Sequence, residues 1–337
     1  YPAHARPTVH RVRAERMSTE ILVEVEHVAR DYGDRRVLRD IHFSLRRGEV
    51  LGFLGPNGAG KTTTMQILSG NLAPSEGRVR IAGHDLLDEP RAAKSALGYL
   101  AETPPLYRDL TVDEYLDYCA ALNRLPRREQ KPAREAAKRK CGLEEAGGRL
   151  IANLSKGYQQ RVGIAQAIIH LPSLVILDEP TVGLDPIQIR EIRALIRDLG
   201  REHSVILSTH VLPEVQTVCD RVLIVHEGEL VLDETIERLD RHMKTASITV
   251  AFHTPPAAGE IERLPGVTAV QPERDGRLRI LHEADANPTA AIVQLASERG
   301  WGLYEIRPGR LSLEQLFVEL TTEREPPAGD DGRGPAP

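Results

Sequence analysis

The stretch Gly55-Pro56-Asn57-Gly58-Ala59-Gly60-Lys61-Thr62-Thr63 decides the fold of this chain. It follows an apolar run, Val50–Leu54, that predicts a buried strand, and it leads into Thr64–Ser69, which predicts the start of a helix. In such a strand–loop–helix unit, glycines let several backbone N–H groups converge on one anion, and the helix dipole adds positive potential. The sequence therefore predicts a phosphate-binding loop and a nucleotide site.

Two side chains of this loop have a specific predicted chemistry. The ammonium of Lys61 is expected to reach the β- and γ-phosphates, and the hydroxyl of Thr62 is expected to hold Mg²⁺. The whole loop supplies candidate ATP contacts, which are Gly55, Pro56, Asn57, Gly58, Ala59, Gly60, Lys61, Thr62 and Thr63.

A second apolar run, Leu174–Leu177, ends in two acidic residues, Asp178 and Glu179. An acid at the carboxyl end of a parallel strand, beside the phosphate-loop strand, points at bound phosphates. We expect Asp178 to take the Mg²⁺ side and Glu179 to polarise the attacking water as general base. A strand-capping turn explains such a pair when it stands alone. Combined with the phosphate loop, the pair indicates hydrolysis of a nucleoside triphosphate.

A further helix begins within Leu154–Arg161. Ser155 and the backbone of Gly157, at the positive end of this helix, predict a second anion cradle. The plain alternative is an ordinary helix start with Ser155 as its N-cap. Because the sequence contains one phosphate loop, the second cradle is predicted to serve the nucleotide of a neighbouring molecule.

Composition narrows the class of protein. The chain has 337 residues and a formal net charge of -5, so no global basic field favours nucleic acid as a partner. Its three cysteines are far apart, which indicates buried thiols in a reducing cytosol rather than disulfides or a zinc site. No apolar run approaches the roughly 18 residues of a membrane span. Residues 1–18 are polar and Arg-rich, and we expect a disordered tail there.

Strand and helix patterns alternate along most of the chain and predict an α/β fold with a largely parallel, doubly wound core. A hairpin-like connection is expected at Arg46–Glu49. Thr111 and Glu114 predict a capping box for a helix over Val112–Leu122, and Pro132 is expected in the first turn of the next helix. The basic run Arg124–Lys140 is interpreted as a solvated helix face, with anionic lipid or a partner as the alternative.

The pattern changes after residue 243. From Ser247 to Ile306 the order strand, helix, strand, strand, helix, strand predicts a small ferredoxin-like α+β module. We therefore expect a nucleotide-binding domain at 19–243 with a helical subdomain at about 103–153, and an accessory domain at 244–321 whose final helix covers Ser312–Leu320. A tail rich in Pro, Gly and Asp is expected to be disordered over 322–337.

The motifs now assembled resemble, in content and order, those of the ATP-binding-cassette (ABC) family over roughly Ile21 to Leu239. The matching segments are Walker A at Gly55–Thr62, the signature at Leu154–Gln159, Walker B at Leu174–Glu179, the D-loop at Gly183–Asp185 and the switch histidine His210. The resemblance implies a P-loop NTPase cassette with a parallel-sheet core, an antiparallel β subdomain and a helical subdomain.

The resemblance also implies residue roles. Two cassettes would pack head to tail and enclose two Mg-ATP between the P-loop of one and the signature of the other. By this resemblance Tyr32 would stack on adenine, and His210 would hydrogen-bond the γ-phosphate. Ser155 and Gly157 would contact the γ-phosphate held by the opposite chain, and Asp185 of the D-loop would be a further nucleotide contact.

Three positions depart from the common family pattern. Glu102 stands where the family most often has Gln, and a carboxylate there can ligate Mg²⁺ or orient water. Lys156 and Tyr158 replace the more usual Gly and Gln of the signature. These variants resemble the exporter-type branch, which includes ATPase subunits of gliding motility, drug export and copper-enzyme maturation.

The resemblance therefore implies an ATP-hydrolysing homodimer that powers export through a separate integral membrane permease. It would bind the cytoplasmic face of the inner membrane peripherally and would have no nucleic-acid partner. Three alternatives are a soluble ABC-type ATPase serving DNA repair or translation, a nucleotide-gated binding module without transport, and another P-loop enzyme such as a kinase. The signature helix and His210 disfavour a kinase, and neither a second cassette nor a coiled-coil insertion is visible for the soluble ATPase.

Overall fold

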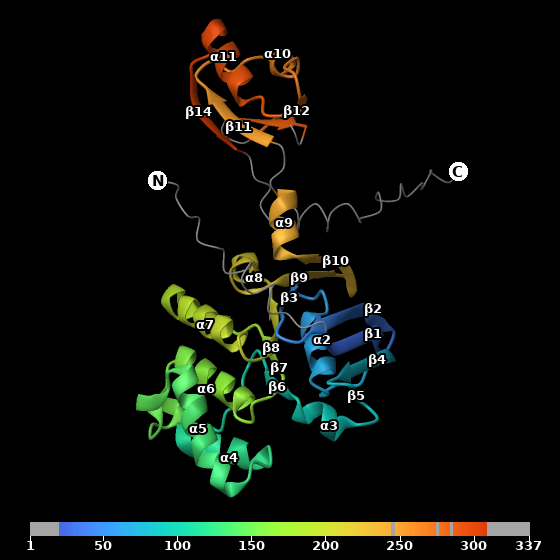
Figure 1. The fold of residues 1–337 in the computed structure, drawn as a ribbon, viewed down its shortest axis with the longest axis vertical. Coiled ribbons are helices and arrows are strands. Elements are labelled where there is room, and N and C mark those ends of the chain that lie inside the picture. Colours follow the sequence, from blue (N-terminus) through green and yellow to red (C-terminus); the bar gives the residue numbers. More distant parts are fainter. Residues whose placement is uncertain (1–19, 244–246, 274–275, 284–285, 309–337) are drawn as a thin grey trace, which may run out of the picture. The chain divides into compact units, whose positions relative to one another are not determined.

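The computed structural model describes residues 20–243, 247–273, 276–283 and 286–308 (Figure 1). The chain divides into two compact units, 1–236 and 237–337, and each is described by itself. The tails expected at 1–18 and 322–337 and the helix expected over Ser312–Leu320 lie outside the described residues.

The first unit is organised on one sheet of order β5-β4-β1-β2-β10-β9-β3-β8-β7-β6. Strands β9, β3, β8, β7 and β6 run parallel, whereas β5, β4, β1 and β2 pair antiparallel. The bounds are β1 (Ile21–Tyr32), β2 (Arg35–Arg46), β3 (Val50–Leu54), β4 (Glu76–Ile81), β5 (His84–Asp85), β6 (Leu97–Leu100), β7 (Leu174–Asp178), β8 (Ser204–Thr209), β9 (Arg221–His226) and β10 (Glu229–Thr235).

Burial explains why each set of strands pairs as it does. Every residue of β3, β7 and β8 is buried, as expected for parallel strands covered on both faces. In β2 the buried residues alternate with exposed ones, which suits a sheet with one solvated face. The parallel core and the antiparallel subdomain predicted from the sequence are therefore confirmed, and Figure 1 shows the antiparallel strands (blue) apart from the helical subdomain (green).

Two local expectations about neighbouring strands are wrong. β2 and β3 do not form a hairpin, because β10 and β9 lie between them in the sheet. The Walker B strand β7 is not beside β3 either, since β8 separates the two. Side chains from late in the sequence fix this arrangement: Arg221 Nε pairs with Glu49 Oε1 at 2.8 Å, and Asp220 Oδ2 accepts from the N–H of Val50 at 2.9 Å.

The helices of the first unit are α2 (Lys61–Leu68), α3 (Pro90–Ser95), α4 (Val112–Leu122), α5 (Arg127–Cys141), α6 (Lys156–Ile168), α7 (Pro186–Leu199) and α8 (Leu212–Val218), with short 3₁₀ turns at Glu144–Ala146 and Ile151–Asn153. Three of these helices, α4, α6 and α7, begin at a side-chain cap, supplied by Thr111, Ser155 and Asp185. The predicted capping box is confirmed: Glu114 N–H donates to Thr111 Oγ1 at 3.3 Å, and Thr111 N–H donates to Glu114 Oε2 at 2.8 Å.

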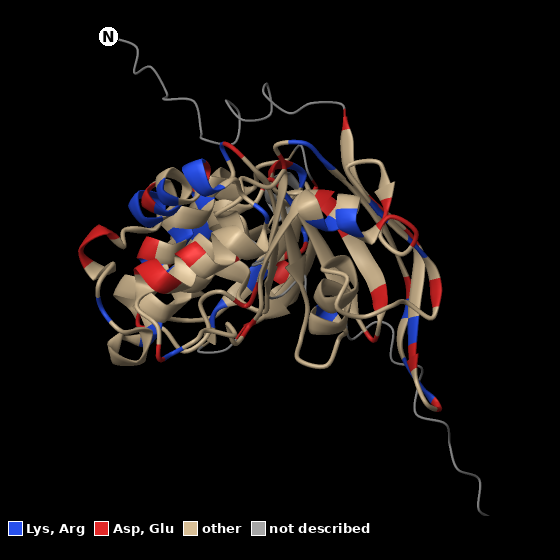
Figure 2. Cartoon of the chain, turned by 90° about the horizontal axis from the view of Figure 1, so that it is seen from below, with Lys and Arg blue, Asp and Glu red and all other residues tan. Residues whose placement is uncertain are grey.

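The position expected for Pro132 is wrong. α5 begins directly after Pro126, and Pro132 lies inside the helix, where it removes one backbone donor. The first turn is held instead by Gln130, whose side-chain amide donates to the carbonyl of Leu125 at 2.9 Å. The basic residues of α5 are partly paired, since Lys138 Nζ lies 2.7 Å from Asp113 Oδ1. Figure 2 shows basic and acidic segments interspersed on the helices of the first unit.

The second unit contains α9 (Ile236–Met243), β11 (Ser247–Phe252), α10 (Ala258–Ile261), β12 (Val267–Pro272), β13 (Leu278–His282), α11 (Thr289–Arg299) and β14 (Leu303–Pro308). Its sheet has the order β12-β13-β11-β14 with every pair antiparallel, which is the ferredoxin-like arrangement. Its core includes Phe252 and Trp301, whose rings meet edge to face at 5.6 Å between centroids.

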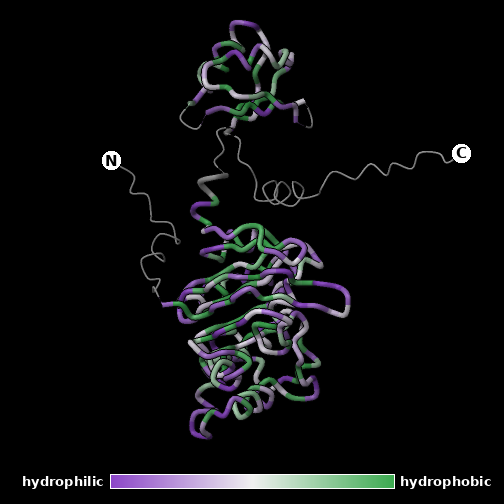
Figure 3. The backbone as a smooth tube through the Cα atoms, turned by 90° about the vertical axis from the view of Figure 1, so that its right-hand side faces the viewer, coloured by the Kyte–Doolittle hydropathy of each residue, from purple (hydrophilic) through white to green (hydrophobic). Residues whose placement is uncertain are grey.

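Hydrophobic stretches are short in both units and alternate with hydrophilic ones (Figure 3). Among the described residues, no helix combines the length and the hydropathy required to cross a bilayer.

We predict that Thr111→Ala weakens the start of α4 by about 1 kcal/mol, because the side-chain acceptor for Glu114 N–H is lost. Hydrogen exchange of a peptide covering 111–122 should then be roughly fivefold faster. Thr111→Ser is the matched control, since its hydroxyl keeps the cap. Equal exchange in the Ala and Ser variants would contradict a capping role.

Candidate nucleotide-binding site

The phosphate-binding loop connects β3 to α2, and its glycines are required by its geometry. Gly60 caps α2 with φ 105°, a left-handed conformation that side chains rarely adopt, and a Cβ there would overlap Leu38. Lys61 follows at the first helical position and is only 6% exposed. Its Nζ donates to the carbonyls of Gly55 at 2.9 Å and Pro56 at 3.3 Å, so the ammonium lies within the loop.

A cavity of about 420 Å³ opens over this loop. It combines loop residues with side chains from four distant segments, and its lining consists of Arg35, Val37, Asn57, Gly58, Gly60, Lys61, Thr62, Thr63, Glu102, Glu179, Val182 and His210. The structure therefore brings the predicted base, the predicted lysine, the predicted Mg²⁺ residues Thr62 and Glu102 and the switch histidine to one place.

Glu179 occupies the centre of a charged triplet. Its Oε1 lies 3.4 Å from Lys61 Nζ, and its two carboxylate oxygens lie 3.0 and 2.9 Å from His210 Nδ1. The side chain is 6% exposed, and the backbone has φ 47°, an uncommon conformation for a non-glycine residue. Such strain persists where surrounding contacts hold it, and here Glu179 N–H donates to the carbonyl of Ser208 at 2.9 Å.

Asp178, one residue earlier, is completely buried. Neither carboxylate oxygen has a well-formed hydrogen bond among the described residues, and the hydroxyl of neighbouring Ser208 is likewise unsatisfied. Burial, reinforced by the negative charges of Glu179 and Glu102, raises the pKa of Asp178 to about 6. The Ser208 hydroxyl lies close enough to oppose this shift without forming a well-aligned hydrogen bond, so a cation would complete the surroundings of this buried acid.

The donor set beside the loop fits Mg²⁺. Thr62, Glu102 and Asp178 offer oxygen ligands, which this hard cation prefers, and the unsatisfied oxygens of Asp178 provide the structural observation for the fit.

Tyr32 lies outside the cavity lining. It ends β1, is 45% exposed and carries the Arg30 guanidinium at 4.9 Å from its ring centroid. It pairs in register with Arg35, which does line the cavity. A second hollow of about 430 Å³ continues along the loop, and it is lined by Arg35, Arg36, Val37, Arg39, Pro56, Asn57, Gly58, Ala59, His226 and Glu227.

The signature and D-loop residues are also outside the cavity lining. Ser155 is the N-cap of α6, where its Oγ accepts from Tyr158 N–H at 3.4 Å. Asp185 is the N-cap of α7 and accepts from Ile187 and Gln188 N–H, each at 2.9 Å. A Cβ on Gly157 would lie 2.7 Å from the side-chain amide of Gln188, so the two helix starts are packed together.

Sequence reasoning missed three lining residues, Arg35, Val37 and Val182. Arg35 and Val37 carried a usable signal, because they directly follow the turn after Tyr32 on the paired strand. Val182 had none, since an apolar residue in a loop is indistinguishable in sequence from a packing residue.

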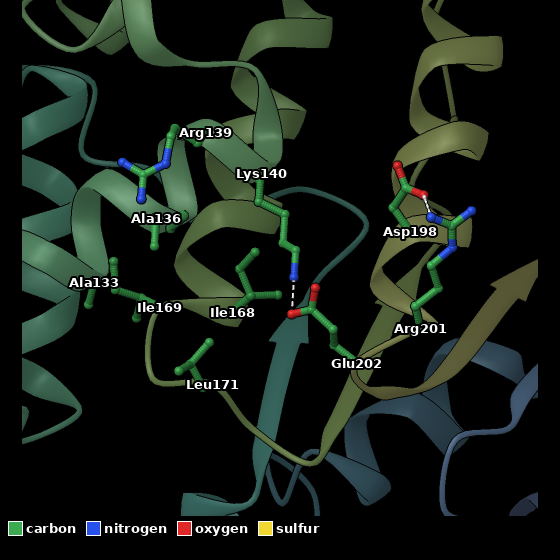
Figure 4. Close-up of a pocket in the computed structure, with 11 residues that line it drawn as sticks. Ala133, Ala136, Arg139, Lys140, Ile168, Ile169, Leu171, Asp198, Arg201 and Glu202 are labelled. Carbon is green, nitrogen blue, oxygen red and sulfur yellow. Dashed lines mark hydrogen bonds and ion pairs between the residues drawn. The ribbon is translucent and has the colours of Figure 1, made fainter. Parts of the chain in front are cut away.

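Another hollow, of about 580 Å³, lies between α5, the end of α6 and the end of α7 (Figure 4). Its apolar part includes Ile168 and Leu171, and its rim carries the ion pair Lys140–Glu202. It adjoins the segments that precede β7 and β8, whereas the phosphate loop follows the end of β3. None of the predicted site residues lines it.

A phosphate loop, an acidic strand end and a parallel sheet define a P-loop nucleotide-binding protein. The family model "ABC transporter" matches residues 38–182. An uncharacterized ABC transporter ATP-binding protein, YxlF of Bacillus subtilis, is 33% identical over 89% of this chain and 99% of its own length. The bacitracin transport ATP-binding protein BcrA of Bacillus licheniformis is 31% identical over 90% of this chain and 98% of its own length.

A solved structure, "ATP binding subunit of ABC transporter", superposes with a TM-score of 0.60 at 33% identity, covering 66% of this chain and 92% of that chain. The chain therefore belongs to the family of ABC transporter ATP-binding proteins, an ATPase family. Because the matches to YxlF and BcrA extend over about nine-tenths of this chain, they reach beyond the cassette into the second unit.

We predict that Asp178→Asn stabilises the protein in metal- and nucleotide-free buffer containing a chelator. The folded-state pKa of about 6 exceeds the ordinary value of 3.8, so ionisation above about pH 6 destabilises the folded state, and this penalty disappears below about pH 4. The gain should reach up to about 3 kcal/mol near pH 7.5 and vanish near pH 4. Thermal unfolding across this pH range measures it.

The control is Asp109→Asn, which removes the same charge from an exposed position. If the Asp178→Asn variant melts at the parental temperature at about pH 7.5, the carboxylate is not held in a destabilising environment.

Proposed function

We propose that this chain hydrolyses ATP as a homodimer and thereby powers export through a separate integral membrane permease. The observation that carries the proposal is the buried carboxylate of Glu179, held between Lys61 and His210 over the phosphate loop. Its position suits a base that takes a proton from water attacking the γ-phosphate.

Each residue of the cavity has a proposed role. Thr62, Asp178 and Glu102 would hold Mg²⁺, which supplies neutralisation of the phosphate charge when bound. Backbone N–H groups between Gly55 and Thr63, except at Pro56, which has none, would cradle the phosphates, and Lys61 would exchange its loop carbonyls for phosphate oxygens. As water forms a bond to the γ-phosphorus, the bond between this phosphorus and the oxygen that bridges it to the β-phosphate breaks. The proton of the attacking water passes to Glu179.

His210 is proposed as a positioning residue for this base as well as a contact of the γ-phosphate. Its Nδ1 lies within hydrogen-bond distance of both Glu179 oxygens, so an N–H at this atom keeps the carboxylate directed into the cavity. Tyr32 is proposed to stack on the adenine, which would lie beyond the phosphate loop on the side of Arg35.

The signature residues are proposed to act on the nucleotide of the partner copy. In support, Ser155, Gly157 and Asp185 do not line the cavity of their own chain, although Ser155 and Gly157 stand at the positive end of a helix. A site completed across the dimer makes hydrolysis depend on protein concentration or on a partner that brings two copies together.

Coupling to a permease is supported by the family and by relatives named for bacitracin transport. We propose a peripheral position on the cytoplasmic face of the inner membrane. The proposed domain limits are 19–243 for the cassette, with its helical subdomain at about 103–153, and 244–321 for a structural or regulatory appendage. Co-purification with a protein of several membrane spans tests this coupling; a soluble ATPase switch would purify without one.

Glu179→Gln should reduce ATP turnover by roughly 10²–10⁴-fold, because the amide cannot accept the water proton. With hydrolysis blocked, the variant should accumulate as an ATP-bound dimer, which size-exclusion chromatography with ATP detects. Glu145→Gln, the same change at an exposed position, is the control. Turnover of Glu179→Gln at the parental rate would refute the base assignment.

A mixing experiment tests the shared site. Lys61→Ala disables the loop and Ser155→Arg disables the signature, so each variant alone should be inactive. In a mixed dimer, the intact loop of the Ser155→Arg chain meets the intact signature of the Lys61→Ala chain, and hydrolysis should return. If mixing restores no activity while both variants remain folded and able to pair, each site is built within one chain.

A further inference from the structure

Two histidines and an aspartate converge on the solvated face of the antiparallel subdomain. In β2, buried Ile41 and Phe43 alternate with exposed residues, which places Asp40 and His42 on the same outer face. In β1, Val25 pairs with Phe43 and Val28 pairs with Ile41. Two residues of β1, Glu26 and His27, therefore oppose the single residue His42 across the pair, which defines a β-bulge.

The bulge directs His27 onto this outer face. His27 has φ 48°, in the left-handed region that non-glycine residues seldom occupy. The bulge is braced from β4, where Gly77 approaches so closely that a Cβ there would lie 2.5 Å from the Glu26 carbonyl oxygen and closer still to that of His27. A strained residue held by its surroundings is characteristic of functional positions.

The three side chains have the spacing of a coordination sphere. Asp40 Oδ1 lies 3.0 Å from His27 Nδ1 and 3.5 Å from His42 Nδ1. Ligand atoms from all three residues lie within 4.8 Å of one another. In a tetrahedral site with bonds of about 2.0–2.1 Å, neighbouring ligand atoms are about 3.3 Å apart. The two Asp40–histidine distances bracket this value, and the ligand nitrogens of the two histidines lie within 4.8 Å of each other, so a metal ion would draw these nitrogens together by up to about 1.5 Å.

We propose that His27, Asp40 and His42 bind a first-row transition-metal ion of the Zn²⁺ or Cu²⁺ type, with water completing the coordination. Two imidazole nitrogens and one carboxylate oxygen form a donor set suited to these ions, whereas Mg²⁺ and Ca²⁺ prefer oxygen ligands alone. The side chains of His27, Asp40 and His42 are 78%, 49% and 59% exposed, so the site is open to ions from solution.

This metal site is separate from the proposed Mg²⁺ site. None of its three residues lines either hollow beside the phosphate loop. The bound ion cross-links β1 to β2 at the bulge, in the same pair of strands that supplies Arg35 and Val37 to the nucleotide cavity. The direct effect of the bound ion is thus to stabilise the pairing of β1 with β2.

The test uses the full-length, nucleotide-free chain and measures Zn²⁺ affinity by competition with a chromophoric chelator. His27→Ala and His42→Ala should each weaken the tightest Zn²⁺ site by at least about tenfold, since even an outer-shell partner of a metal ligand is worth 10–100-fold. His84→Ala is the matched control: His84 Nδ1 lies 3.1 Å from Glu89 Oε1, an exposed histidine–carboxylate pair that has no third ligand within the described part of the chain. This control should bind as the parent does.

A second measurement identifies the ligands. The electron paramagnetic resonance spectrum of bound Cu²⁺ should show nitrogen couplings that weaken in each histidine variant, and Asp40→Asn should reduce affinity while leaving these couplings in place. Zn²⁺ affinity that is equal in the parent and both histidine variants, or Cu²⁺ spectra unchanged by them, would overturn the proposal. Metal-free melting temperatures verify that the variants are folded.

Discussion

The first unit depends on placing opposite charges where water is excluded. Lys61 and Glu179 are nearly buried and Asp178 is completely buried, all at the edge of the sheet where the parallel strands end. An isolated buried charge costs several kcal/mol, so the ammonium is stabilised by loop carbonyls and by Glu179, and Glu179 is stabilised by His210. Among the described residues neither oxygen of Asp178 has a well-formed hydrogen bond, and Lys61 acts on it only as a nearby charge, so a bound cation would complete its surroundings.

The position of these charges follows from the sheet. Because β3, β8 and β7 run parallel, the loop after β3, Ser208 near the end of β8 and the acids at the end of β7 come to one edge. β8 contributes directly, since its Ser208 carbonyl accepts from the backbone of Glu179. The strand that lies between the phosphate-loop strand β3 and the acidic strand β7 thus holds Glu179, the proposed general base, in its uncommon backbone conformation.

Much of this was predictable because it depends on local patterns. The phosphate loop, the acidic strand end and the Thr111 capping box are each encoded in short, contiguous stretches with a recognisable spacing, and the order of helices and strands in the second unit follows from a series of such local patterns. What sequence reasoning could not supply is contact between distant segments. The insertion of β9 and β10 between β2 and β3 depends on Asp220 and Arg221 meeting residues about 170 positions earlier.

The same limit applies inside the candidate site. The pairing of His210 with Glu179 and the exposure of Val182 to the cavity are tertiary features without a local sequence pattern. The bulge at His27 is another example, because an alternating strand pattern gives no sign of the extra residue that turns this side chain outward. Pro132 is the opposite case, because a local pattern gave a wrong prediction. The preference of proline for the first turn of a helix placed the helix start near Pro132, whereas α5 begins directly after Pro126 and Gln130 caps its first turn.

The close packing of Gly157 against Gln188 has a mechanical meaning. Because Gly157 has no side chain, the Gln188 side chain from the first turn of α7 packs directly against the backbone at the start of the signature helix. A shift of the first turn of α7 toward α6 would therefore press the Gln188 side chain against the backbone of Gly157.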